Sequence, residues 1–307
     1  MYWPETVTIN DVGLRDGLQL ESTILTAEQK KLIADGLIKA NVKTIEFGSF
    51  VHPKLVPQMA NSGEVFELLK NQGDVKLIAL IPNLKGAQNA ASKGIKQVNT
   101  VFSASNTHNL QNIKQTTQTS IENYKQIKEF CDEHHMKLDV SLATSFGCPF
   151  EGEISESRIH SIIGQITQIG VDTITLADTT GMANPKQVYE LVNGVVAQFP
   201  DQKFNLHFHN TRDMGLPNIL AGIQAGVSSF DAALGGLGGC PFAPGATGNV
   251  CTEDVVHMLH NMGIDTGIDL DQLLKTSALL QDLVGHELPS SVLKAGKSNR
   301  KYEVPVS

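Results

Sequence analysis

The sequence has few cysteines for its length and no long apolar run. Its 307 residues include four cysteines, which are Cys131, Cys148, Cys240 and Cys251. Four are too few for a disulfide scaffold, so we expect a reducing compartment in which any important cysteine acts as a thiol. No apolar run approaches the roughly 18 residues that a membrane helix needs, and residues 1–5 lack the basic and apolar regions of a signal peptide. We therefore expect a cytoplasmic protein with no membrane partner.

Clustered positive charge and nucleotide-binding glycine motifs are also missing. The net charge is −8, and no block of like charges occurs. Because a nucleic-acid surface needs clustered Lys and Arg, we expect no nucleic-acid partner. No Gly-x-Gly-x-x-Gly follows the first predicted strand, and no Walker loop is present, which argues against an open, doubly wound sheet that binds nucleotides.

The sequence does contain a regular alternation of strand and helix patterns. Short β-branched apolar runs predict eight strands, at 7–10, 44–47, 76–81, 97–103, 137–144, 173–177, 203–209 and 229–233. Helical patterns lie between and after them, at 27–39, 64–71, 85–93, 121–134, 156–169, 186–199, 217–225 and 253–262, with a further helix at 270–284. Several of these helices open with a Ser or Thr that can cap free backbone N–H groups, namely Thr26, Ser120, Ser155 and Thr252.

This alternation predicts an α/β fold with a parallel sheet, and eight units predict closure into a (β/α)₈ TIM barrel with an extra C-terminal helix. Such barrels take about 250 residues. We expect one catalytic barrel domain over residues 1–307, in which residues 270–307 form a C-terminal helical extension.

The segment Asn205–Asn210 carries a His-x-His motif at the end of the seventh predicted strand. Residues i and i+2 of a strand point to the same face, so His207 and His209 are expected to project side by side, with Leu206 and Phe208 facing the opposite layer. Two imidazoles on one face can bind one metal ion, although a strand histidine is also often a hydrogen-bonded core residue.

The barrel places further polar residues at the same end as these histidines, the C-terminal face on which barrel enzymes carry their chemistry. Asp16 follows the first strand, and Asn249 lies in the loop after the eighth. A carboxylate, two imidazoles and an amide oxygen with no thiolate suit Mg²⁺ or Mn²⁺ better than zinc, while a non-haem Fe(II) site with a similar triad stays open. A divalent ion in such a site can bind a substrate hydroxyl and a neighbouring carbonyl together, and a hydroxyl made acidic in this way favours cleavage of an adjacent carbon–carbon bond.

Other candidate residues lie around this predicted metal site. Arg15 is expected to stabilise a developing enolate oxygen, or to form only a surface ion pair. Glu46 and Asp178 are acids in or after strands that could orient Arg15 or the histidines, or only cap turns. Cys240 lies in a glycine-rich loop and is a candidate proton donor when that loop closes over the site. Cys148 occupies a similar stretch, whereas Cys131 and Cys251 are expected to be inert.

A set of short motifs is spread along nearly the whole chain. The segments are residues 15–19, 49–51, 53–54, 56–59, 82–86, 207–209, 236–243 and 248–249. Together they resemble the 3-hydroxy-3-methylglutaryl-CoA lyase family of metal-dependent, aldolase-like barrels, most strongly in the loop that contains Cys240.

The resemblance implies cleavage of 3-hydroxy-3-methylglutaryl-CoA to acetyl-CoA and acetoacetate, with roles in leucine degradation and ketone body metabolism. It implies an acyl-CoA substrate, a divalent metal (Mg²⁺ or Mn²⁺) and a homo-oligomer, with a dimer suspected. The implied metal ligands are Asp16, His207, His209 and Asn249. The implied catalytic residues are Cys240, Arg15, His207, Glu46 and Asp178, with Arg15 also contacting the thioester carbonyl and His207 also relaying a proton.

Two departures from the family pattern concern the acyl pocket. Residues 20–22 read Leu-Glu-Ser where the family often has Asn-Glu-Lys, and Asn210 follows His209 where an Asp is common. A lyase for another 3-hydroxyacyl-CoA, such as citramalyl-CoA, therefore remains an alternative. A condensing synthase of the isopropylmalate type is a second alternative, although such synthases usually carry a C-terminal regulatory domain and lack the Gly-Gly-Cys-Pro loop.

The absence of an organelle leader and of a C-terminal cysteine or peroxisomal tripeptide suggests a bacterial cytosolic form. Asn83–Lys85 and Asn112 are weak candidates for contacts with the CoA nucleotide.

Overall fold

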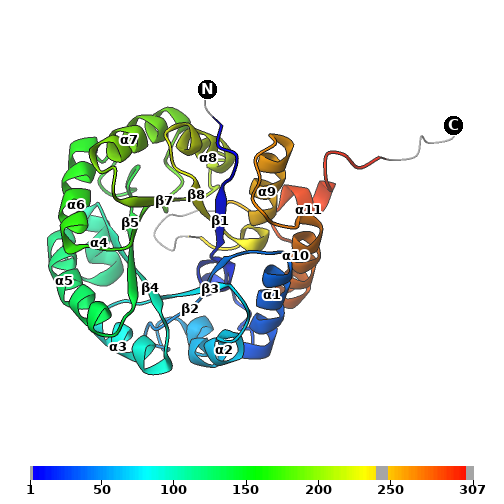
Figure 1. Ribbon diagram of the computed structural model, residues 1–307, viewed down its shortest axis with the longest axis horizontal. Coiled ribbons are helices and arrows are strands. Elements are labelled where there is room, and N and C mark those ends of the chain that lie inside the picture. Colours follow the sequence, from blue (N-terminus) through cyan, green and yellow to red (C-terminus); the bar gives the residue numbers. More distant parts are fainter. Residues whose placement is uncertain (1–2, 240–247, 302–307) are drawn as a thin grey trace.

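Eight parallel strands close into a barrel in the computed structural model, which describes residues 3–239 and 248–301 (Figure 1). Each strand pairs with the next along the chain, and β8 pairs with β1. The predicted (β/α)₈ barrel is thereby confirmed, and every predicted strand is present. The strands are β1 (Thr8–Asp11), β2 (Thr44–Ser49), β3 (Lys76–Leu80), β4 (Gln97–Ser103), β5 (Lys137–Ala143), β6 (Thr173–Asp178), β7 (Lys203–Phe208) and β8 (Ser229–Ala232).

The helices form a ring outside the barrel, as Figure 1 shows. They are α1 (Ala27–Lys39), α2 (Ser62–Leu69), α3 (Leu84–Lys93), α4 (Asn106–Ile113), α5 (Thr117–Glu133), α6 (Glu156–Ile169), α7 (Pro185–Gln198), α8 (Gly215–Gln224), α9 (Thr252–Asn261), α10 (Leu270–Val284) and α11 (Ser291–Ala295). The predicted C-terminal helix has the expected bounds in α10, whereas α4 and α11 were not predicted. The domain division itself stays a prediction.

Two of the predicted helix caps are wrong. The helix expected to open at Ser120 begins a turn earlier, because the Thr116 side chain accepts a hydrogen bond from the Thr119 backbone and starts α5 there. Thr252 is the first residue of α9 rather than its cap, and its hydroxyl instead donates to the Asp11 carboxylate over 2.7 Å.

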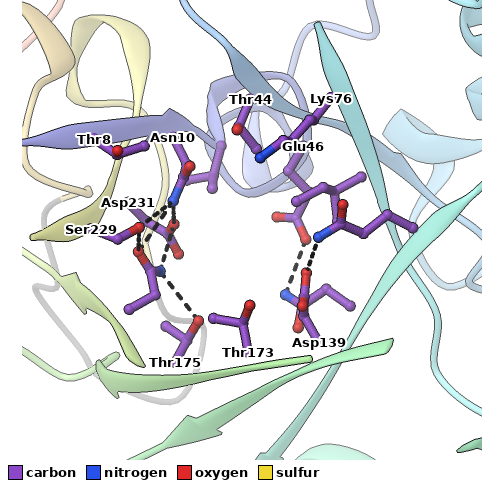
Figure 2. Close-up of a pocket in the computed structure, with 15 residues that line it drawn as sticks. Thr8, Asn10, Thr44, Glu46, Lys76, Asp139, Thr173, Thr175, Ser229 and Asp231 are labelled. Carbon is purple, nitrogen blue, oxygen red and sulfur yellow. Dashed lines mark hydrogen bonds between the residues drawn. The ribbon is translucent and has the colours of Figure 1, made fainter. Parts of the chain in front are cut away.

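The strands separate an apolar outer layer from a polar interior. Leu206 and Phe230 face α8 so closely that a Cβ on Gly222 would lie 2.4 Å from the Leu206 side chain. Barrel interiors are usually filled by branched apolar side chains. Here a cavity of about 250 Å³ enters the barrel and is lined mainly by polar residues, among them Glu46, Asp139 and Asp231 (Figure 2). The barrel interior is therefore suited to polar contacts.

The C-terminal elements pack beside the first helix, and Figure 1 shows α10 next to α1. The helices approach closely at Gly36, where a Cβ would lie 2.5 Å from the Thr276 side chain. Beyond α10, the His286 imidazole contacts the Glu21 carboxylate over 2.7 Å, which connects this segment to the loop after β1. Within residues 3–239 and 248–301, no helix is long and apolar enough to cross a membrane.

Candidate metal centre and active site

Asp16, His207 and His209 converge at the C-terminal end of the barrel. The Nε2 atoms of the two histidines are 3.1 Å apart, and Asp16 Oδ2 lies 4.0 Å from that of His207 and 3.8 Å from that of His209. All three side chains are buried. About 190 residues of sequence separate the carboxylate from the imidazoles, and closure of the barrel between β1 and β8 brings them together.

Local backbone geometry orients His207 and Asp16. His207 lies in β7 between Leu206 and Phe208, so the alternation of the strand turns its imidazole toward the barrel axis. Asp16 lies on a π-helical turn over Gly13–Gly17, in which the N–H groups of Arg15 and Asp16 both donate to the Val12 carbonyl. Such turns are rare and often occur at functional sites, because the extra residue redirects side chains.

Asn249 joins this group from the loop after β8. Its Nδ2 donates to Asp16 Oδ2 over 2.7 Å and to the Leu237 carbonyl over 2.9 Å, while its Oδ1 is buried and has no hydrogen-bond partner among the described residues. A buried acceptor without a partner is costly unless a ligand satisfies it. Gly238 permits this approach, since it has φ +120° and a Cβ there would lie 2.5 Å from Asn249 Nδ2.

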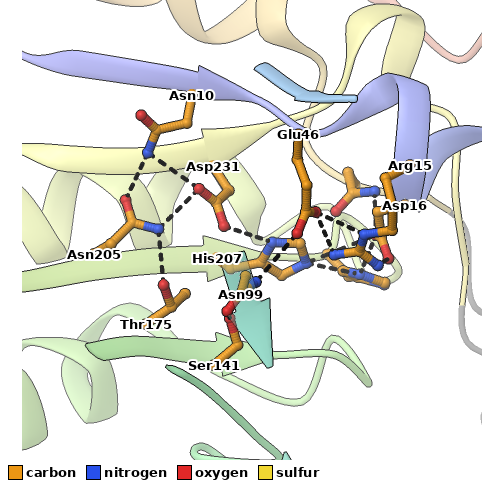
Figure 3. A network of polar contacts seen from close by, with 12 residues as sticks. Asn10, Arg15, Asp16, Glu46, Asn99, Ser141, Thr175, Asn205, His207 and Asp231 are labelled. Atoms are coloured by element: carbon orange, nitrogen blue, oxygen red, sulfur yellow. Dashed lines mark hydrogen bonds and ion pairs between the residues drawn. The ribbon is translucent and has the colours of Figure 1, made fainter. Parts of the chain in front are cut away.

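The Arg15 guanidinium lies between two carboxylates, as Figure 3 shows. Its Nη1 donates to Asp16 Oδ1 over 2.5 Å, and its Nε donates to Glu46 Oε2 over 2.6 Å. Only 7% of the Arg15 surface is exposed. The surface ion pair considered from sequence is therefore excluded for Arg15. Glu46 contacts Arg15, and its predicted orienting role stays a prediction.

Charge and burial oppose each other in this cluster. Burial disfavours the charged form of Asp16, but Arg15 and the two histidines outweigh it and hold the pKa of that carboxyl well below its usual range. Burial raises the pKa of Glu46 in spite of Arg15 beside it. Burial also disfavours protonated His207, yet the carboxylates of Asp231 and Asp16 raise its pKa above the usual value. An ionised Asp16 is the form that binds a cation.

Asp178 has a different position from the other predicted residues. It is the last residue of β6, and its carboxylate accepts hydrogen bonds from the backbone N–H groups of Met182 and Ala183 over 2.8 and 3.0 Å. Burial raises its pKa in spite of these bonds. The carboxylate thus closes the turn before α7, which is the turn-capping role considered from sequence, and its catalytic role stays a prediction.

The described cysteines are three buried free thiols, whereas Cys240 lies outside the described residues. Burial raises the pKa of Cys131 to about 11, and burial also raises that of Cys251. Both are therefore poor nucleophiles, which agrees with the expectation that they are inert. Cys148 Sγ donates to Ser105 Oγ over 3.0 Å and accepts backbone N–H groups from the loop that follows it, so it has a structural role.

A polar network that was not predicted from sequence lies on the inward faces of β1, β7 and β8. Asn10 lies beside Asp231 in the strand register, Asn205 lies two residues before the β7 partner of Asp231, and the three side chains are hydrogen-bonded to one another (Figure 3). A signal was present, since Asp231 lies between apolar residues in a predicted strand. Its meaning depends on the barrel register, which places it opposite His207.

Glu253 fixes the start of the loop that leads toward Cys240. Its Oε2 accepts the backbone N–H of Gly235 over 3.0 Å, and Gly235 has φ +70°, which favours glycine. The Glu253 side chain is fully buried, and burial raises its pKa from 4.5 to about 7. The group therefore binds its proton more tightly in the folded protein than in the unfolded chain.

The free energy of unfolding of the parent is expected to fall between pH 5 and pH 8, and we expect a smaller fall in Glu253→Gln. A raised carboxyl pKa contributes stability below the unfolded value, and this contribution is lost as pH rises through the folded value, by on the order of 3 kcal/mol at most. The measurement is the free energy of unfolding in urea at both pH values, for the parent and the variant. An equal change in both proteins would contradict this role for Glu253.

The donors fit a hard divalent cation. Two ligands that each lie about 2.1 Å from one Mg²⁺ can be at most about 4.2 Å apart, and the three ligand atoms of Asp16, His207 and His209 all meet that limit. The three residues form the only group of at least three His, Cys, Asp or Glu ligands that the described part of the chain brings close enough for one ion. Fold and site together define a (β/α)₈ barrel with a candidate metal site of oxygen and imidazole donors at its C-terminal face.

Comparison with known proteins identifies the family. The HMGL-like family matches residues 6–280, and the chain belongs to it. An (R)-citramalyl-CoA lyase of Chloroflexus aurantiacus is 41% identical, with 95% of each chain covered. A hydroxymethylglutaryl-CoA lyase of Bacillus subtilis is 37% identical, with 97% of this chain and all of the relative covered. The solved structure of an HMG-CoA lyase from A. baumannii in complex with coenzyme A and 3-methylmalate is 44% identical, covers 99% of this chain and 100% of that one, and has a TM-score of 0.94.

These relatives confirm the resemblance to hydroxymethylglutaryl-CoA lyases and the prediction that the chain is an enzyme of the carbon–carbon lyase class. They also include a citramalyl-CoA lyase, which was the first alternative substrate class considered from sequence. The names of the relatives therefore include two substrates, 3-hydroxy-3-methylglutaryl-CoA and citramalyl-CoA.

Proposed function

We propose that this protein cleaves 3-hydroxy-3-methylglutaryl-CoA to acetyl-CoA and acetoacetate with the help of a divalent cation. The observation that carries the proposal is the convergence of Asp16, His207 and His209 beside the Arg15 guanidinium in a chain of the HMGL-like family. Asn249 is proposed as a fourth ligand because its buried Oδ1 has no partner among the described residues.

Each residue has a separate task in the proposed reaction. A bound Mg²⁺ or Mn²⁺ would supply positive charge that makes the substrate 3-hydroxyl more acidic. The hydroxyl proton passes to solvent, since His207 has Nε2 toward the cation site and Nδ1 toward Asp231. The hydroxyl carbon becomes a ketone, and the bond to the acetyl-CoA carbon breaks with both electrons left on that carbon. Arg15 stabilises the resulting enolate oxygen, and Cys240 donates a proton to the carbon. One proton leaves the substrate and one is returned, so the reaction is balanced.

Glu46 positions Arg15, and Asp178 positions the turn before α7. Glu46 holds the guanidinium from the side opposite Asp16 through the 2.6 Å contact. Asp178 supports the site by fixing the turn between β6 and α7. We propose these as indirect roles, since the Glu46 carboxylate accepts from Arg15 and the Asp178 carboxylate accepts from two backbone N–H groups.

Citramalyl-CoA is the second candidate substrate. The Chloroflexus relative that carries this activity in its name is 41% identical, a value above that of the Bacillus lyase at 37%. The departures at residues 20–22 and at Asn210 also concern the proposed acyl pocket. Both reactions release acetyl-CoA, so they share the mechanism and differ in the keto acid.

A panel of CoA thioesters tests the proposal directly. The purified protein is incubated with Mg²⁺ and either 3-hydroxy-3-methylglutaryl-CoA, citramalyl-CoA or a longer branched analogue, and acetyl-CoA and the keto acid are measured. We expect the highest kcat/KM for 3-hydroxy-3-methylglutaryl-CoA. A higher value for citramalyl-CoA would reassign the substrate, and no acetyl-CoA from any thioester would overturn the proposed function.

We also propose a compartment and an oligomeric state for the enzyme. Free, buried thiols at Cys131, Cys148 and Cys251 support a reducing compartment, and we propose the cytoplasm. A homodimer remains a prediction, which sedimentation of the purified protein would check.

A further inference from the structure

The carboxylate of Asp231 lies beside one of the proposed metal ligands, His207. The parallel register pairs Asp231 of β8 with His207 of β7, so both side chains point into the barrel at the same level. Asp231 Oδ2 is 3.3 Å from His207 Nδ1, and the other ring nitrogen faces Asp16 and His209 (Figure 3). The imidazole is thus held between a carboxylate on one side and the proposed cation site on the other.

Asp231 is itself held by amide groups of neighbouring strands. Its Oδ1 accepts hydrogen bonds from Asn205 Nδ2 over 2.8 Å and from Asn10 Nδ2 over 3.2 Å. The Asn205 amide is fixed in turn, because it accepts from Ser229 over 2.8 Å and donates to Thr175 over 3.2 Å. These bonds occupy one carboxylate oxygen and direct the other toward His207.

The second histidine has no such support. His209 Nδ1 is buried and has no hydrogen-bond partner among the described residues, whereas His207 Nδ1 faces Asp231. The two imidazoles therefore differ in what fixes their orientation. Only His207 combines a ring nitrogen toward the cation site with a carboxylate on the other ring nitrogen within the described part of the site.

We propose that Asp231 is a positioning residue, which holds His207 in the tautomer with the proton on Nδ1 so that the Nε2 lone pair faces the cation. The inference rests on the metal site of the proposed function. A carboxylate that accepts the outer N–H of a histidine ligand fixes the ring and strengthens it as a donor, and loss of such a carboxylate typically weakens metal affinity about 10–100-fold. Asn10 and Asn205 act one step further away, by holding Asp231.

Asp231→Asn tests this role against a matched control, Asp139→Asn. Asp139 is a carboxylate on β5 that lines the same cavity, but it accepts from Gln97 over 2.6 Å and makes no described contact with the histidines. Mn²⁺ dissociation constants are measured without substrate at pH 7.5, from the electron paramagnetic resonance signal of free Mn²⁺. We expect affinity to fall about 10–100-fold in Asp231→Asn and to stay near the parent value in Asp139→Asn.

A spectroscopic readout separates positioning from a general loss of structure. In the metal-free parent, ¹⁵N–¹H correlation spectra of the histidine rings are expected to show His207 protonated on Nδ1, and this pattern is expected to be lost in Asp231→Asn. A His207 protonated on Nε2 in the parent would overturn the inference even if the variant failed to fold. Equal Mn²⁺ affinity in the parent and Asp231→Asn, or an equal loss in Asp139→Asn, would also overturn it. If the parent itself bound no Mn²⁺, the metal site of the proposed function would fail as well, which distinguishes the two outcomes.

Discussion

Asp16→Asn is expected to abolish tight Mn²⁺ binding and to lower kcat by about 10³ or more, since the proposed metal would be lost from the site. The substitution replaces the only carboxylate among the proposed ligands with a neutral amide. The single carbonyl oxygen of the amide can accept only one of two hydrogen bonds that Asp16 now accepts on different oxygens, from Arg15 Nη1 over 2.5 Å and from Asn249 Nδ2 over 2.7 Å, and its NH₂ group faces the other donor. The variant should therefore lose both the charge and the orientation that suit a cation.

Mn²⁺ titration and acetyl-CoA release at saturating Mg²⁺ measure the two parts of this effect. Asp139→Asn is again the matched control, because it removes a buried carboxylate from the same barrel without touching the proposed ligands. Circular dichroism should show that both variants are folded. A folded Asp16→Asn protein with the Mn²⁺ affinity of the parent would show that the ion, if any, binds elsewhere.

The fold could be predicted from sequence because each element carries its own pattern. The strands are β-branched apolar runs of the right length, and helices such as α1 and α6 have caps and apolar stripes that set their bounds locally. Helix α4 lacks such a pattern and was not predicted. Its buried residues are His108 and Asn109, and polar residues that face inward leave no apolar periodicity to detect. The closed order of the strands followed from counting eight units rather than from any one motif.

The site was predictable only where spacing or chain order carried the information. The His-x-His spacing fixes the face of a strand, and the ends of parallel strands meet on one side of the barrel, so Asp16 and the histidines could be brought together. The partners of His207 could not be predicted, because they depend on which residue of β8 lies opposite it. That register is set by barrel closure and identifies Asp231 as the neighbour.

Arg15→Ala is expected to lower kcat by about 10²–10³ while Mn²⁺ still binds, since removal of one group that stabilises a developing oxyanion typically has an effect of this size. The guanidinium is buried and held by Asp16 and Glu46, so it needs no reorganisation when charge develops on the enolate oxygen. Arg15→Lys retains the charge but cannot contact both carboxylates and the substrate in one plane, so we expect only partial activity from it.

The comparison of kcat with metal affinity decides what Arg15 does. If Arg15 only anchored Asp16, its removal would weaken Mn²⁺ binding, and excess Mn²⁺ would restore turnover. If it stabilises the enolate, turnover stays low at saturating Mn²⁺. Glu46→Gln should then lower kcat less than Arg15→Ala does. The guanidinium remains present and keeps its contact with Asp16 through Nη1. It loses only the negative charge of the partner that Nε and Nη2 now contact. An Arg15→Ala protein with parental kcat at saturating Mn²⁺ would exclude a direct role for the guanidinium in the chemistry.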